Sequence, residues 1–71
     1  MIAVFKTNVS TITKAKSIIR MLKIQFSGCK PNFDLEDCDK VLRVENKAED
    51  IITGVVRLLN ENGFECVELE D

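Results

Sequence analysis

The sequence predicts an α+β domain in which two helices cover one face of a four-stranded antiparallel sheet. Four segments alternate apolar and polar side chains, which is the period of a strand that is buried on one face. Two further segments repeat apolar side chains at helical spacing along one side only. Along the chain these segments follow the order strand, helix, strand, strand, helix, strand, with short polar connections between them.

The first strand and the first helix occupy the N-terminal part of the chain. Residues 2–7 alternate and predict a short strand. Ser10 or Thr11 can cap the helix that follows, because a hydroxyl there accepts a hydrogen bond from a backbone N–H of the first turn. The helix is predicted over residues 12–26, and Gly28 can adopt the left-handed conformation that ends it. Its apolar stripe consists of Ala15, Ile18, Ile19, Leu22 and Phe26.

A hairpin is predicted after the first helix. Pro31 cannot continue a helix, and residues 32–36 and 40–45 each alternate polar and apolar side chains. The segment 37–39 between them has the composition of a turn. The two strands are therefore predicted to pair with each other through that turn.

The second helix and the last strand complete the pattern. Asn46 and Glu49 have the spacing of a capping box in front of this helix. The pair Asn62–Gly63 stops it, and residues 64–70 alternate as a last strand. Gly54 lies inside the helix, where glycine costs about 1 kcal/mol relative to alanine, so we expect it to permit close packing against a neighbour. The apolar face of the helix comprises Ile51, Ile52, Val55, Val56, Leu58 and Leu59.

These elements define a topology. Neither helix has a second apolar face, so both must pack on the same side of one sheet. Right-handed crossovers then place the first and third strands in the middle of the sheet. This is the ferredoxin-like βαββαβ two-layer sandwich, and residues 1–71 are predicted to form it as a single domain.

Composition excludes several function classes. The chain has no histidine, and its three cysteines, Cys29, Cys38 and Cys66, form no CxxC pair. No nucleophile, base and orienting group are recognisable together, so neither an enzyme nor a bound cofactor is predicted. No apolar run approaches the ~18 residues of a spanning helix, which argues against a membrane protein. We expect a cytoplasmic protein with reduced thiols.

Charge is divided unevenly along the chain. Residues 1–33 carry six basic residues and no acidic one, whereas residues 34–71 carry all twelve acidic residues and four basic ones. Such a division predicts docking to an acidic protein surface, and also salt-sensitive head-to-tail self-association. The four aromatic residues are all Phe and do not follow the strand pattern of RNA-binding sheets, which argues against nucleic acid. The predicted docking residues on the first helix are Lys14, Lys16, Arg20, Met21 and Lys23, with Ile24 beside them.

Two short stretches resemble a known family. The run Asn8–Ile18 is similar to the loop and first helix of heavy-metal-associated domains, the copper-chaperone-like βαββαβ modules. Their signature is Gly-Met-Thr-Cys-x-x-Cys, followed by Ala and, four residues past the second Cys, by an aliphatic residue. Asn62–Phe64 looks like the Gly-aromatic turn that precedes the last strand of that family.

The resemblance breaks at the residues that bind metal in that family. When the chains are aligned on Ala15 and Ile18, the two ligand cysteines fall on Thr11 and Lys14. Thr is a poor ligand for Cu(I), which selects thiolate and thioether, and Lys14 places a positive charge where the metal would lie. The resemblance therefore implies the fold of the family with no metal at these positions. Lys14 either extends into water or offers its charge to a carboxylate of a partner.

Two alternatives to an interaction module stay open at this point. Cys38 and Cys66 are both predicted near the end of the sheet that carries the first loop, so a metal carrier could use them, including across a dimer. A small-ligand regulatory domain is the second alternative, because unrelated sensors share this fold.

Overall fold

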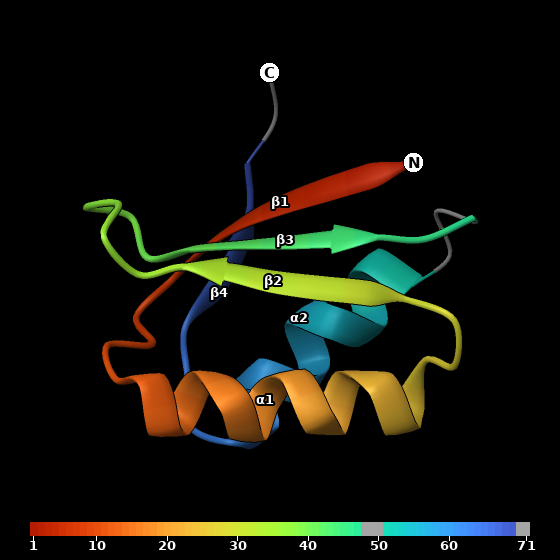
Figure 1. Cartoon of the computed structure of the whole chain (residues 1–71), viewed down its shortest axis with the longest axis horizontal. Helices are drawn as coiled ribbons and strands as arrows, with labels where there is room; N and C mark the ends of the chain where they lie inside the picture. Colours follow the sequence, from red (N-terminus) through yellow and green to blue (C-terminus); the bar gives the residue numbers. More distant parts are fainter. Residues whose placement is uncertain (48–50, 70–71) are drawn as a thin grey trace.

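Six elements follow one another in the predicted order in the computed structural model of the chain, which describes residues 1–47 and 51–69 (Figure 1). They are β1 (Ile2–Thr7), α1 (Ile12–Gln25), β2 (Lys30–Asp34), β3 (Val41–Glu45), α2 (Ile52–Glu61) and β4 (Cys66–Glu68).

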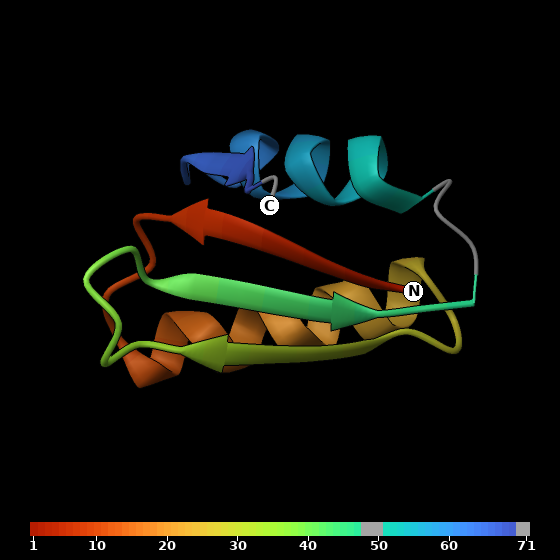
Figure 2. The same cartoon turned by 90° about the horizontal axis from the view of Figure 1, so that it is seen from above.

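The strands form one antiparallel sheet in the order β2-β3-β1-β4. The first and third strands are therefore in the middle, as the crossover rule predicts. Both helices lie on the same side of the sheet, α1 below β2 and α2 beside β4 (Figures 1 and 2). The prediction of a ferredoxin-like two-layer sandwich is confirmed.

The core lies between the sheet and the two helices. Phe5 is fully buried at the centre of β1, opposite Leu42 of β3. The largest fully buried side chains are Phe5, Ile18, Leu22, Leu42, Leu59, Val9, Val44 and Val55, and they come from both middle strands, both helices and the first loop. Burial of apolar side chains from every layer is what holds so small a domain together.

The first helix begins and ends close to the predicted positions. Thr11, and not Ser10, is its N-cap, and the Thr11 hydroxyl accepts a hydrogen bond from the Lys14 N–H at 3.2 Å. Phe26 follows the last helical residue, and Gly28 has a φ of 92°, in the left-handed region that favours glycine.

The predicted hairpin strands need correction at the turn. The second strand was expected over residues 32–36, but it ends at Asp34, because Leu35 belongs to the turn and its carbonyl accepts a bond from Lys40 Nζ at 3.3 Å. Lys40 has a φ of 47° and donates its N–H to Asp37, so the third strand starts one residue later, at Val41. Pro31 is tolerated within β2 because β2 is an edge strand.

The last strand is shorter than the predicted 64–70. Phe64 donates its N–H to the carbonyl of Leu59, and Glu65 donates its N–H to Asn8 Oδ1 at 2.8 Å. Both residues are thereby held out of the ladder, and β4 covers only Cys66–Glu68.

Glu49 of the predicted capping box lies outside the described residues. The N-cap position of α2 is Ile51, which makes no side-chain cap bond.

Gly54 brings the two helices together as predicted. A Cβ built at this position would lie 2.6 Å from Phe26 Cζ, which is closer than two carbons can approach.

We expect Gly54→Ala to destabilise the domain by about 1–3 kcal/mol through overpacking, although alanine is the better helix former. Urea denaturation of Gly54→Ala, Phe26→Leu and the double variant measures this. Once Phe26 is replaced by Leu, Gly54→Ala should become stabilising, and a stabilising effect in both backgrounds would contradict the proposed contact.

Candidate functional site

Three connections meet at one end of the sheet, and we call this the loop end. They are the loop between β1 and α1, the turn between β2 and β3, and the connection between α2 and β4 (Figure 1). The N–H of Thr7 donates to the carbonyl of Asp39 at 3.1 Å, which joins the first loop to the turn. The bond from the Glu65 N–H to Asn8 Oδ1 joins the same loop to the start of β4.

Thr7 organises the loop end. Its side chain is buried, with 6% of the residue exposed. The hydroxyl donates to the carbonyl of Lys40 at 2.6 Å and accepts from the N–H of Val9 at 3.2 Å, so one side chain ties two connections together. Sequence reasoning missed this residue. Its burial could have been predicted from the alternation of the strand, because Thr7 lies on the same inward face as Ala3 and Phe5.

Thr11 and Lys14 are the residues that the resemblance aligns with metal ligands, and the structure gives each a contact within the chain. Thr11 caps α1. The Lys14 ammonium lies 6.0 Å from the centroid of the Phe64 ring, at the limit of a cation–π interaction. The side chain of Lys14 is thus exposed but lies over the turn that closes before β4, and does not simply extend into water.

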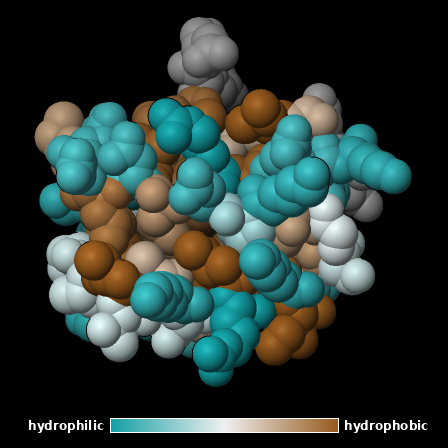
Figure 3. All heavy atoms as spheres, viewed as in Figure 1, coloured by the Kyte–Doolittle hydropathy of each residue, from teal (hydrophilic) through white to brown (hydrophobic). Residues whose placement is uncertain are grey.

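The predicted docking residues lie on the outer face of α1. Lys16, Arg20 and Lys23 are all exposed, and none of them forms an ion pair with any residue of the described part of the chain. We call these three side chains the basic row. Hydrophilic and hydrophobic side chains are interspersed over α1 and the edge of β2 (Figure 3).

The two apolar residues predicted beside the basic row, Met21 and Ile24, differ in their exposure. Met21 is half-buried and packs against the core, so it offers little surface to a partner. Ile24 is 76% exposed and Ile12 is 67% exposed. Ile12 was missed because it is the first residue of α1, where helical spacing does not distinguish a core position from a surface one.

The three cysteines are free thiols. Cys66 is buried opposite Thr7, and burial raises the pKa of its thiol to about 11. Burial also raises the pKa of the Cys29 thiol, although contact with backbone and the charge of Lys23 oppose this, and Cys29 lies at the other end of the sheet. Cys38 lies on the turn at the loop end, as predicted, and its side chain is exposed.

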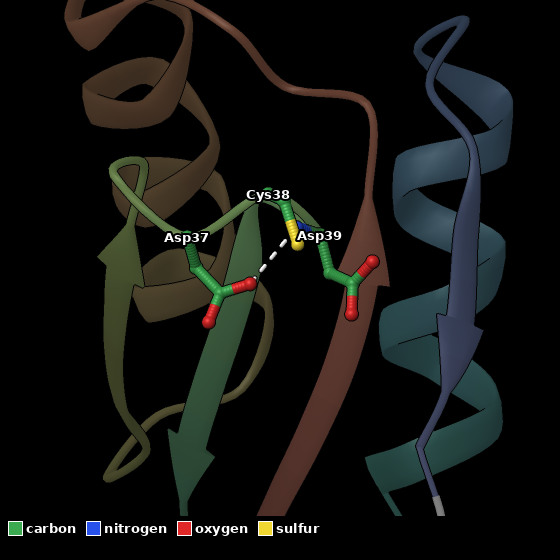
Figure 4. Close-up of side chains that lie close together, drawn as sticks. All are labelled: Asp37, Cys38 and Asp39. Carbon is green, nitrogen blue, oxygen red and sulfur yellow. Dashed lines mark hydrogen bonds between the residues drawn. The ribbon is translucent and has the colours of Figure 1, made fainter.

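Asp37, Cys38 and Asp39 lie close together on this turn, with their possible ligand atoms within 4.8 Å of one another (Figure 4). Asp37 Oδ1 accepts a bond from the Asp39 N–H at 2.9 Å, and the Asp39 carboxylate pairs with Lys6 at 3.6 Å. Both carboxylates therefore have partners within the chain. Cys66 belongs to no group of three or more possible ligands over residues 1–47 and 51–69, so the two cysteines of the predicted carrier are not brought together with a third ligand.

Comparison with known proteins supports the fold. No protein-family model and no curated protein matches the sequence. Among solved structures, the N-terminal domain of PacS from Synechocystis PCC6803 superposes with a TM-score of 0.70 over 99% of this chain and 98% of that one. The fold is ferredoxin-like. At 8% sequence identity the likeness to the PacS domain is one of fold alone. Neither helix of the described chain is long and apolar enough to cross a membrane.

Proposed function

We propose that this chain is a non-catalytic, cytoplasmic interaction module that resembles a heavy-metal-associated domain without its metal ligands. It docks an acidic protein surface through the outer face of α1. The observation that carries the proposal is the basic row of Lys16, Arg20 and Lys23, exposed and without an ion pair in the described chain, between two exposed isoleucines. The fold shared with the PacS domain is consistent with it.

Charge and apolar contact have different roles at this surface. An exposed ion pair contributes roughly 0.2–1 kcal/mol, so three such pairs mainly orient the partner and speed the encounter. Full burial of an isoleucine contributes roughly 1.5–3 kcal/mol. Ile12 and Ile24 would therefore supply much of the affinity, while the basic row selects an acidic partner. Lys14 adds a further charge at the loop end of the same helix.

Metal transport by the non-motif cysteines has less support. Metal binds to the thiolate, and a thiol with a pKa of about 11 is almost fully protonated at neutral pH. Cys66 would also have to leave its buried position opposite Thr7. Cys38 alone is accessible, and one thiol between two partnered carboxylates is a weak site for a soft metal.

Charge reversal on α1 tests the docking proposal. We expect Lys16→Glu/Arg20→Glu/Lys23→Glu to fold normally but to lose at least about tenfold in affinity, or 1.4 kcal/mol, for an acidic amphipathic probe peptide of Glu and Leu. Fluorescence anisotropy measures the binding and circular dichroism checks the fold. Arg43→Glu/Lys47→Glu/Arg57→Glu is the matched control, since these exposed residues belong to other segments than α1 and change the net charge equally. Equal losses in both variants, or no loss in either, would overturn the proposal.

A further inference from the structure

We infer that the acidic surface bound by α1 is the turn between β2 and β3 of a second copy of this chain. The inference rests on the proposed docking role of α1 and names the partner. Two surfaces of opposite charge are present on the same molecule, the exposed basic row and an acidic turn on which Glu36 is exposed and Asp34 is half-buried. The rest of the described chain leaves both of them available to another copy.

The acidic surface consists of Asp34, Glu36, Asp37 and Asp39, with Leu35 among them. Asp39 pairs with Lys6, and Asp37 caps the turn, but Asp34 and Glu36 form no ion pair over residues 1–47 and 51–69. The nearest cation in sequence, Lys40, is turned back to donate to the carbonyl of Leu35. The turn thus keeps a net negative charge beside a half-buried leucine.

The outer face of α1 has the complementary composition. It presents the basic row together with Ile24, the most exposed of the large hydrophobic side chains described. A contact between copies would pair carboxylates of the turn with the basic row and cover Ile24 with apolar surface around Leu35. Within one chain, no ion pair joins the turn to α1 over the described residues.

Two different surfaces meet in this contact. A copy that offers only one of them to each neighbour builds chains or rings, whereas a reciprocal pair, in which each helix meets the turn of the other copy, closes a two-fold dimer. The formal net charge is only −2, so long-range repulsion between copies is weak. The free edge of β4 is a poorer self-contact, because the strand has 3 residues and offers few backbone hydrogen bonds to a second copy.

Sedimentation velocity of the wild-type chain is the first measurement. At about 0.01 M salt, where the Debye length is about 30 Å, we expect the average mass to rise above 8.0 kDa as the protein concentration increases. At about 1 M salt, where it is about 3 Å, only the monomer should remain. A wild-type chain that stays monomeric at low salt overturns the inference. If the α1 charge reversal nevertheless weakens binding of the acidic peptide, the proposed docking function stands and only self-association is ruled out.

Two charge-reversed variants decide which surfaces meet. The helix variant is Lys16→Glu/Arg20→Glu/Lys23→Glu, and the turn variant is Asp34→Lys/Glu36→Lys. Each alone should be monomeric at low salt, since the helix variant has an acidic helix and an acidic turn, whereas the turn of the turn variant no longer has a net negative charge. Mixed in equal amounts they should associate, because the basic row of the turn variant then meets the unchanged acidic turn of the helix variant.

A matched variant separates loss of this contact from a general effect of net charge. Glu61→Lys/Glu65→Lys changes the net charge by the same amount as the turn variant, at exposed residues outside the turn. Because it keeps both the basic row and the acidic turn, it should associate with itself at low salt as the wild-type chain does. Loss of self-association in this variant as complete as in the turn variant, or failure of the helix and turn variants to associate when mixed, would overturn the inference.

Discussion

The double variant Thr11→Cys/Lys14→Cys is expected to bind Cu(I) in a one-to-one complex that the wild-type chain does not form. Residue 11 caps α1, and its side chain already lies against the backbone of residue 14, one helical turn on. Two thiols there would face the same end of the helix. A helix N-terminus lowers the pKa of a thiol, and soft thiolates select Cu(I). The change also removes the ammonium of Lys14, which repels a metal cation.

Titration with Cu(I) under reducing conditions, against a coloured Cu(I) chelator as competitor, measures this gain. Thr11→Ser/Lys14→Ser removes the same cap methyl and the same charge without adding a thiolate, and should bind no better than the wild type. Tight one-to-one binding by the wild-type chain would defeat the metal-free assignment. A folded double-cysteine variant that takes up no metal would show that these positions are not equivalent to the ligand positions of the resembled family.

Replacing Thr7 by Val is expected to destabilise the domain by about 1–3 kcal/mol, the usual cost of leaving a buried polar group without its partner. The carbonyl of Lys40 and the N–H of Val9 would both lose their bond to the Thr7 hydroxyl, while the volume of the side chain barely changes. For a domain of this size each kcal/mol lowers the melting temperature by roughly 4–8 °C. The effect is a large part of the stability of a small domain.

Thermal denaturation followed by circular dichroism measures the loss. Thr7→Ser keeps the hydroxyl and should retain most of the stability, although it removes one buried methyl group. If Thr7→Ser destabilised the domain more than Thr7→Val, packing of the methyl group and not the two hydrogen bonds would be the dominant contribution. Amide hydrogen exchange at Val9 gives a second readout, and we expect faster exchange in Thr7→Val alone.

Much of the fold could be predicted from the sequence because its causes are local. Periods of two and of 3.6 residues identify strands and helices, and the one-sided apolar faces require both helices to cover the same side of the sheet. Thr11 and Gly28 act at helix ends through hydrogen bonds and backbone angles within a few residues. The exposure of Lys16, Arg20 and Lys23 follows from their place opposite the apolar stripe.

Where the sequence prediction stopped, contacts between distant residues decide the structure. The last strand is short because the Glu65 N–H bonds to Asn8, 57 residues away in the chain. Lys14 lies over Phe64, and Gly54 faces Phe26, only because the two helices lie side by side on one sheet. Thr7 looks like an ordinary strand residue, yet its hydroxyl joins two connections.

The sequence by itself therefore determined the order of the elements, the charges of the basic row, and the local resemblance that aligns Thr11 and Lys14 with the metal ligands of another family. Only the tertiary structure decided where strands end, which apolar side chains remain exposed beside the basic row, and what each loop-end residue contacts. The physical reason is that side-chain periodicity and helix capping depend on residues only a few positions apart in the sequence. Hydrogen bonds and packing between segments far apart in sequence depend on the assembled sheet and its helices.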